Sequence, residues 1–230
     1  MADYAFSAPA QPVVPIADST ALFPVHRIYC VGRNFAEHAK EMGAEVSRGR
    51  PVFFMKPADA IVIDGEVPYP GVTADLHHEV ELVVAIGTDA QGIVPIESAL
   101  DLVFGYTVGL DLTRRDLQAE AKDKRLPWDI AKGFDASAPL AALVPIARAG
   151  HDFKRRLWLQ VNGQLRQQAP LSDMVFSVAE IIHELSKLFA LRAGDLVFMG
   201  TPSGVAALQR GDHFHAGVDG LAELRGRILP

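Results

Sequence analysis

Short apolar runs bounded by Gly, Pro, Asn and Asp recur along most of the chain, and this pattern predicts many short β-strands. The run at 78–86 carries apolar residues on both of its alternating faces, so we expect it to be buried on two sides. Asn162 and Gly163 separate two further runs, and this dipeptide is typical of a tight hairpin turn. The expected strands cover residues 27–31, 52–55, 60–63, 78–86, 103–111, 157–161, 164–168, 195–199, 212–218 and 221–228.

Three segments begin with residues that favour a helix start, in which a small polar side chain precedes an acid by three positions. After the second of them, apolar residues recur at helical spacing from Val178 to Phe189, which predicts a helix packed on the core. Strands outnumber helices and do not alternate regularly with them, so the expected architecture is a mixed α+β fold, largely β, with few helices. The three pairs are Asn34 with Glu37, Ser177 with Glu180 and, in a weaker version, Thr113 with Asp116.

The length of the chain predicts one domain. A chain of 230 residues, 49% of them hydrophobic, can bury a sizeable core without disulfides or structural metals. Residues 1–25 hold four prolines and little periodicity, which predicts an extended N-terminal arm on a single domain of residues 1–230.

Composition and charge exclude several classes of protein. A formal net charge of -6 argues against a nucleic-acid partner, because such proteins usually carry a basic surface. No apolar run is long enough for a membrane helix, and the N-terminus has no signal-peptide pattern. Cys30 is the single cysteine, so no intrachain disulfide can form, and its apolar neighbours predict a buried thiol that only packs. We therefore expect a cytoplasmic protein.

The strand expected at 78–86 also carries two acids. Alternation places Glu79 and Glu81 on one face, about 7 Å apart along the strand. Carboxylates in a strand buried on both sides are costly unless a cation neutralises them, which predicts a metal site. The alternative is that the strand lies at a sheet edge, where water would solvate both glutamates.

A third acid ends another expected strand. Gly105, Thr107, Gly109 and Asp111 share one face of the run at 103–111, and the small residues permit close approach of another strand or of a ligand. Three carboxylates form a hard-oxygen set that suits Mg²⁺ or Mn²⁺. His77, which precedes the two glutamates, could turn the site toward zinc, but its place at the strand end favours a position outside the ligand set.

A histidine and an acid form a second candidate group. His38 and Glu41 are three residues apart on the first expected helix, so both side chains fall on one face and can hydrogen-bond. A histidine oriented by a carboxylate is a competent general base for water. An exposed helix rich in Glu, Lys and His shows the same spacing, so a solvated pair is the alternative.

Further polar residues lie beside glycine or proline. Lys56, Lys132 and Thr201 stand in such turns, and the lysines there suggest cations that point inward toward an anionic substrate, although surface loops are the alternative. The chain lacks a G-x-S-x-G nucleophile elbow, a Walker A motif and a G-x-G-x-x-G dinucleotide fingerprint. ATP, GTP and NAD chemistry is therefore not expected.

Taken in order, these segments resemble the fumarylacetoacetate hydrolase superfamily from about residue 25 to the end. Together with the lead-in before Cys30, they look most like its fumarylpyruvate hydrolase and acylpyruvase branch. The segments are Cys-Val-Gly-Arg-Asn-Phe-Ala-Glu-His from Cys30, Phe-Phe-Met-Lys-Pro from Phe53, His-Glu-Val-Glu-Leu from His78, Gly-Tyr-Thr-Val-Gly-Leu-Asp from Gly105, Arg-Arg-Asp-Leu-Gln from Arg114, Ala-Lys-Gly-Phe-Asp from Ala131 and Gly-Thr-Pro-Ser-Gly-Val from Gly200.

The resemblance implies a mixed β-roll catalytic domain, a homodimer, and Mg²⁺ or Mn²⁺ as the cofactor. It implies that the metal ligands are Glu79, Glu81 and Asp111. It further implies that His38 and Glu41 activate water from a lid segment, and that Lys132 and Gln118 contact the substrate. Arg33, Lys56 and Thr201 match positions that line the substrate pocket.

The resulting hypothesis is hydrolysis of the C–C bond of a 2,4-diketo acid, an acylpyruvate such as fumarylpyruvate, to a carboxylic acid and pyruvate. The alternatives are an oxaloacetate decarboxylase, or an isomerase or hydratase of related keto acids. A protein that binds small 2-keto acids without turnover is a further alternative of a different class.

Overall fold

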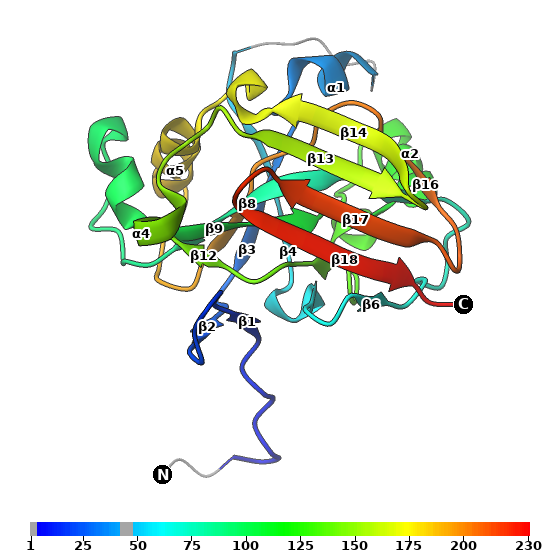
Figure 1. Cartoon of the computed structure of the whole chain (residues 1–230), viewed down its shortest axis with the longest axis horizontal. Helices are drawn as coiled ribbons and strands as arrows, with labels where there is room; N and C mark the ends of the chain where they lie inside the picture. The colour runs from blue at the N-terminus through cyan, green and yellow to red at the C-terminus, as the bar shows by residue number, and fades with distance from the viewer. Residues whose placement is uncertain (1–3, 42–47) are drawn as a thin grey trace.

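Two β-sheets face each other across the main core in the computed structural model, which describes residues 4–41 and 48–230 (Figure 1). The inner sheet has six strands in the order β12-β9-β8-β15-β3-β4, and the outer sheet has five in the order β14-β13-β17-β18-β6. The inner strands are β12 (Val144–Pro145), β9 (Val103–Leu110), β8 (Val80–Ile86), β15 (Leu196–Phe198), β3 (Ile28–Gly32) and β4 (Val52–Lys56). The outer strands are β14 (Gln164–Pro170), β13 (Arg156–Val161), β17 (His213–Val218), β18 (Ala222–Ile228) and β6 (Glu66–Val67).

Smaller sheets and short helices surround this pair of sheets. The small sheets pair β10 (Thr113–Arg114), β7 (Leu76–His78) and β16 (Ala206–Leu208), then β1 (Val13–Pro15) with β2 (Leu22–Pro24), and β11 (Ala138–Pro139) with β5 (Ile61–Val62). The α-helices are α1 (Ala36–Glu41), α2 (Arg115–Asp123), α3 (Asp129–Lys132), α4 (Ile146–Ala149) and α5 (Val178–Ser186). Three 3-10 helices cover Ala58–Ala60, Ile96–Leu102 and Leu171–Asp173. The predicted fold class, mixed with few helices, is confirmed.

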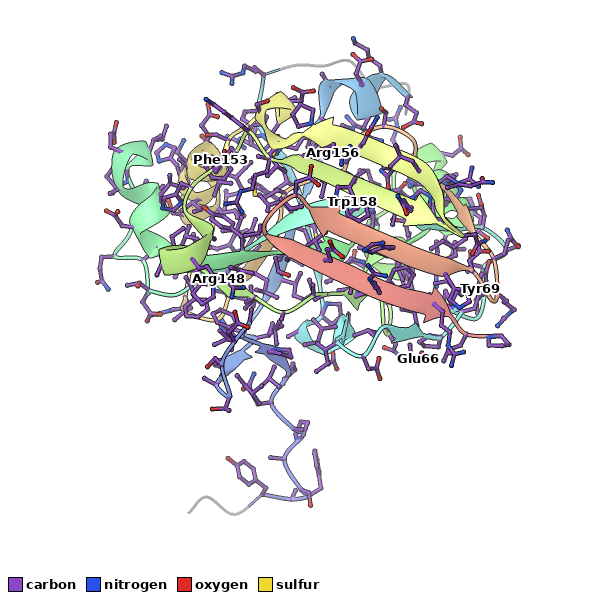
Figure 2. All side chains as sticks on the ribbon, in the orientation of Figure 1. Glu66, Tyr69, Arg148, Phe153, Arg156 and Trp158 are labelled. Carbon is purple, nitrogen blue, oxygen red and sulfur yellow. The ribbon has the colours of Figure 1, made fainter. Side chains whose placement is uncertain are left out.

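The central strand β8 is buried along its whole length, as its two apolar faces predict. Leu82 and Val84 pack into the core shared with the outer sheet, whereas Val83 and Ala85 pack into a second core on the opposite face. Cys30 lies fully buried in that second core, so the predicted burial of the thiol is confirmed. The outer sheet turns its other face to solvent, where Trp158 packs against His215 with ring centroids 4.7 Å apart (Figure 2).

The single strand expected at 78–86 is wrong in one respect. The predicted strand is interrupted at Glu79 and forms two strands, β7 and β8, which belong to different sheets. The backbone carbonyl of Glu79 accepts a hydrogen bond from the Asp111 N–H at 2.8 Å, while β7 pairs with β10 and β16. Glu79 therefore lies at a corner between sheets, a position that alternation within one segment does not reveal.

Two of the local turn and cap predictions are confirmed. Asn162 and Gly163 both have positive φ, 50° and 75°, and join β13 to β14 in a hairpin. Ser177 and Glu180 form the full capping box of α5. The apolar stripe of that helix is buried as far as Leu185, but Leu188 lies past the helix end and is 52% exposed.

The other two cap predictions are wrong, because the side chains of Asn34 and Asp116 bond residues far away along the chain. Asn34 bonds the backbone of Phe176 and Met199 and so ties the start of α1 to a distant segment. Helix α2 begins at Arg115 without a side-chain cap, and Asp116 accepts instead from Thr73 and Ala74.

The N-terminal residues form a separate two-stranded ribbon, which precedes β3, the first strand of the inner sheet along the chain. Strands β1 and β2 pair antiparallel, and Val14 and Phe23 are buried in the second core. Residues 4–10 extend away from the rest of the chain (Figure 1). None of the helices in the described part of the chain is long and apolar enough to cross a membrane.

The bare face of β9 is covered by chain, as its small residues predict. Gly109 forms a β-bridge with Leu140, and a Cβ at Gly109 would lie 2.7 Å from a Leu140 side-chain carbon and 3.0 Å from the Phe198 ring.

We expect Gly109→Ala to lower the free energy of unfolding by about 1–3 kcal/mol through overpacking. Gly71→Ala is the matched control, because a Cβ there meets nothing within 4 Å, and its effect should stay within about 0.5 kcal/mol. Urea denaturation in excess Mg²⁺ measures both, and equal stabilities would contradict this account of the β9 face.

Candidate metal centre and its cavity

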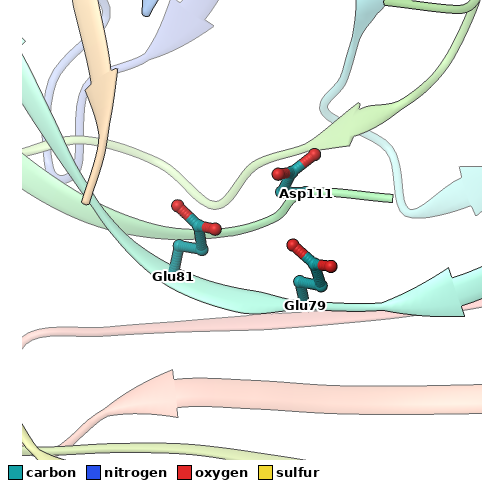
Figure 3. Close-up of side chains that lie close together, drawn as sticks. All are labelled: Glu79, Glu81 and Asp111. Atoms are coloured by element: carbon teal, nitrogen blue, oxygen red, sulfur yellow. The ribbon is translucent and has the colours of Figure 1, made fainter. Parts of the chain in front are cut away.

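Three carboxylates meet at one end of the central strands β8 and β9 (Figure 3). Glu79 lies at the break before β8, Glu81 lies within β8, and Asp111 follows the last residue of β9. In the antiparallel register Glu81 lies opposite Gly109, which has no side chain to compete for the space. One oxygen from each carboxylate lies within 4.8 Å of the other two. We call these three residues the acidic trio.

The carboxyl group of Glu81 is the most strained electrostatically. It is 2% exposed, and its Oε2 accepts a hydrogen bond from the Gly200 N–H at 2.7 Å. Burial, together with the neighbouring charges of Asp111 and Glu79, raises the pKa of Glu81 well above its ordinary value. A cation bound among the three carboxylates would favour the charged form of Glu81 and so oppose this rise.

Glu79 is held in its charged form by two cations. Burial alone would raise its pKa, but the ammonium of Lys132 and the guanidinium of Arg115 hold the pKa of Glu79 well below its usual range. Lys132 Nζ donates to Glu79 Oε2 at 2.8 Å, and Arg115 Nη2 donates to the other oxygen. Each carboxylate oxygen of Glu79 thus has one charged donor.

Lys132 bridges the carboxylates of Glu79 and Asp111. Its Nζ also donates to Asp111 Oδ2 at 2.6 Å and to Thr113 Oγ1 at 2.7 Å, so all three of its protons are used. Burial lowers the pKa of Lys132, but the adjacent Asp111 and Glu79 raise it overall above its ordinary value. The lysine is therefore charged and points inward, as the sequence suggests.

Lys56 lies behind the trio and not in the cavity. Its Nζ is 2.9 Å from Asp111 Oδ1 and donates to the backbone carbonyls of Leu112, at 3.1 Å, and Lys132. The side chain is fully buried. Its geometry suits a counter-ion for Asp111, and the substrate contact expected for it stays a prediction.

The donor set fits a divalent cation such as Mg²⁺ or Mn²⁺. All three groups are carboxylates, the ligands that hard cations prefer. Asp111 Oδ1 accepts no hydrogen bond from any described residue, although Lys56 lies close to it. His77 is not part of the acidic trio. Its Nδ1 accepts a hydrogen bond from Arg115 at 3.3 Å, and its Nε2 lies 2.9 Å from Asp75. Both ring nitrogens thus have partners outside the trio, so the geometry does not favour the alternative of a zinc site that includes His77.

His38 and Glu41 form the expected pair on α1. His38 Nδ1 lies 3.3 Å from Glu41 Oε2, and the Gly204 N–H contacts both Glu41 oxygens at 3.2 Å. His38 is only 7% exposed, so the alternative of a solvated pair is wrong for the histidine. Burial lowers the pKa of His38 below its ordinary value despite the nearby charges of Glu79 and Glu41. The imidazole is therefore neutral near pH 7 and able to accept a proton.

A cavity of about 430 Å³, including its open mouth, brings most of these side chains together. Glu41 contacts His38 but does not itself line the cavity. Gln118 and Thr201 are nearly buried in its wall and are held by Arg115 and Gln167, respectively. The residues expected from the sequence that line the cavity are Arg33, His38, Glu79, Glu81, Asp111, Gln118, Lys132 and Thr201.

The sequence reasoning missed two cations of the same cavity, Arg115 and Lys122. Both lie on α2 with Gln118, at spacings of three and four residues, so the three side chains share one helical face. That spacing was the available signal.

Comparison with known proteins places the chain among relatives of one family. The fumarylpyruvate hydrolase of Pseudomonas aeruginosa, solved in complex with Mn²⁺ and pyruvate, is 45% identical and superposes with a TM-score of 0.95 over 99% of both chains. The mitochondrial oxaloacetate tautomerase of Rattus norvegicus is 45% identical over 202 residues, 87% of this chain and 90% of the relative. The mitochondrial oxaloacetate decarboxylase of Dictyostelium discoideum is 40% identical over 197 residues, 85% and 89% of the two chains.

The family model that describes the fumarylacetoacetate (FAA) hydrolase C-terminal region matches residues 27–229, which is nearly the whole chain. The resemblance inferred from the ordered motifs is thereby confirmed, and the Mn²⁺ of the Pseudomonas structure agrees with the hard-oxygen ligands described above. The chain belongs to the fumarylacetoacetate hydrolase family.

Proposed function

We propose that this protein is a divalent-metal-dependent hydrolase that cleaves the C–C bond of a 2,4-diketo acid, an acylpyruvate such as fumarylpyruvate. The products are a carboxylic acid and pyruvate. The observation that carries the proposal is a buried histidine, oriented by Glu41, in the same cavity as the acidic trio. The pyruvate in the solved Pseudomonas relative is the product expected of this reaction, which supports the assignment.

His38 acts as the general base in this mechanism. Its neutral imidazole takes a proton from water, and Glu41 stabilises the imidazolium that forms. The water oxygen bonds to C4 of the diketo acid, the C3–C4 bond breaks, and its electron pair passes to C3 as a pyruvate enolate. C3 then takes the proton back from His38, so one water is consumed and the atoms balance.

The remaining residues bind and orient the keto acid. A divalent cation held by Glu79, Glu81 and Asp111 would supply positive charge where the enolate develops. Arg115 and Lys132 add fixed cations beside it, since both contact Glu79. Gln118 and Thr201 offer polar atoms from the buried wall of the cavity, where their positions are fixed by hydrogen bonds.

Oxaloacetate decarboxylation is the second candidate, and a tautomerase or related isomerase function belongs with it. The observation that favours it is the naming of relatives 40–45% identical as oxaloacetate decarboxylase and oxaloacetate tautomerase. Loss of CO₂ from oxaloacetate gives the same pyruvate enolate but needs no water. The trio and Lys132 serve both reactions, whereas His38 as a base for water serves only hydrolysis.

We also propose a homodimer. Strand β4 is an edge of the inner sheet, and Met55 and Leu126 line a hollow beside it with exposures of 39% and 54%. Exposed apolar residues at a sheet edge favour association. Sedimentation equilibrium should give twice the chain mass of 24.9 kDa, and a monomer at micromolar concentration would refute the proposal.

The cytoplasmic location stays a prediction, and the two curated relatives named above are mitochondrial.

The metal assignment predicts a separation between stability and ion binding at Glu81. Glu81→Gln removes a buried charge while its amide oxygen can still accept from the Gly200 N–H, so the variant should be at least as stable as wild type in chelator. It should bind Mn²⁺ at least about tenfold more weakly, with a correspondingly smaller rise in Tm on adding the ion. Chelation should abolish turnover of the wild type, and Mg²⁺ or Mn²⁺ should restore it.

Titration followed by electron paramagnetic resonance measures the Mn²⁺ affinity. Glu66→Gln is the matched control, because Glu66 is an exposed glutamate paired with Arg227 away from the cavity. Unchanged Mn²⁺ affinity in Glu81→Gln, or full wild-type activity in excess chelator, would refute the metal centre.

The base assignment predicts different losses in two reactions of one variant. His38→Ala should lower hydrolysis of acetylpyruvate or fumarylpyruvate by roughly 10² to 10⁴, and oxaloacetate decarboxylation far less. Glu41→Gln should act in the same direction more mildly. Loss of diketone absorbance and release of CO₂ measure the two rates. Glu37→Gln, at an exposed position of the same helix, is the control. Equal losses in both reactions would mean that His38 does not activate water.

A further inference from the structure

Two cations of the cavity have no carboxylate partner. Arg33 and Lys122 both line the cavity of the acidic trio, and neither forms an ion pair with any residue in the described ranges. By contrast, Lys132, Arg115 and Lys56 each contact an acid of the trio. These three cations lie against Glu79 and Asp111, whereas the positive charges of Arg33 and Lys122 have no acid of the trio beside them.

These two cations lie toward the mouth of the cavity. The carboxylates of the trio are at most 5% exposed, whereas Lys122 is half-buried and Arg33 is exposed. Lys122 follows Gln118 by one turn of α2, and its Nζ stands 5.5 Å from the centre of the Trp128 ring. Burial, reinforced by the charges of Arg115 and Arg33, lowers the pKa of Lys122. Since Arg33 and Lys122 line the same cavity, an anion bound between them would offset the repulsion of their positive charges.

Trp128 connects the two cations across the cavity wall. Its ring lies 3.8 Å from where a Cβ of Gly32 would stand, next to Arg33, and it packs edge-on against Phe54 at 5.9 Å between centroids. Arg33 itself has a φ of 62°, a left-handed conformation that is costly for a long side chain and that is often kept at ligand sites. The cavity therefore has a buried metal end, an aromatic wall and a cationic mouth.

We propose that Arg33 and Lys122 form a second anion subsite, which binds the distal carboxylate of a 2-keto diacid whose keto-acid end lies at the acidic trio. This inference rests on the proposed function and specifies its substrate class. It also reconciles the names of the relatives, since oxaloacetate and fumarylpyruvate are both 2-keto acids with a second carboxylate at the far end. The long stems of the two side chains accommodate diacids of different length.

Binding of two unreactive keto acids tests the subsite without any turnover. 2-Oxoglutarate and 2-oxopentanoate have the same chain length, and only the first has a distal carboxylate. Isothermal titration of Mn²⁺-loaded wild type should give about 10- to 100-fold tighter binding of 2-oxoglutarate, the range expected for charge-assisted hydrogen bonds. Lys122→Met and Arg33→Asn should each reduce this preference, and the double variant should remove it.

The substitutions are chosen to preserve the fold. Methionine keeps an apolar stem against Trp128, asparagine tolerates the left-handed backbone of residue 33, and Lys122→Arg should keep the preference because it keeps the charge. Lys124→Met is the matched control, since Lys124 lies on the same helix end but pairs with Glu120. Retained Mn²⁺ binding shows that each variant is folded.

Two results would overturn the subsite: no preference for the diacid in wild type, or equal weakening of both ligands in the variants. The hydrolase proposal fails separately, if wild type turns over neither acetylpyruvate nor fumarylpyruvate. Where both diketo acids are hydrolysed, the kcat/KM for fumarylpyruvate should fall in the double variant about 10- to 100-fold more than that for acetylpyruvate, mostly through KM.

Discussion

The burial of three like charges at one end of β8 and β9 is the constraint on which the rest of the site depends. Carboxylates removed from water cost several kcal/mol each unless cations and hydrogen bonds compensate. Here Lys56, Lys132 and Arg115 reach the trio from three different elements, β4, α3 and α2. The elements that supply those cations are therefore drawn together around the end of the two strands, and a divalent ion completes the neutralisation of the remaining carboxyl group, that of Glu81.

The fold makes room for this charged cluster by leaving side chains out. Gly109 lies opposite Glu81 and lets the segment at Leu140 and the Phe198 ring close over the strand. On the other side, Asn34 fastens the start of α1 to the backbone of Phe176 and Met199, so the helix that carries His38 is anchored where it leaves β3. The rigid part of the site thus comes from the sheet, and the proposed base comes from a short helix attached to it.

The relatives of this chain differ in the reaction for which they are named. In the proposed mechanisms both hydrolysis and decarboxylation form the enolate of pyruvate, beside the acidic trio and Lys132. In the mechanism proposed here, hydrolysis differs from decarboxylation in its need for the base on α1, whereas Arg33 and Lys122 would bind the distal carboxylate that both substrates carry. On this proposal the choice between the two reactions depends on the short helix α1, while the buried charge cluster is common to both.

The sequence by itself determined the strands, the Asn162-Gly163 hairpin, the Ser177 cap and the acidic trio, because alternation and capping depend on residues close together in the chain. The ordered motifs also determined the family. Only the tertiary structure decided that the chain breaks at Glu79, that Asn34 bonds a segment 142 residues away instead of capping α1, and that Lys56 lies behind Asp111. The structure also showed that Arg115 and Lys122 line the cavity. Which cation meets which carboxylate depends on how distant strands and helices pack, and no local pattern in the chain encodes that packing.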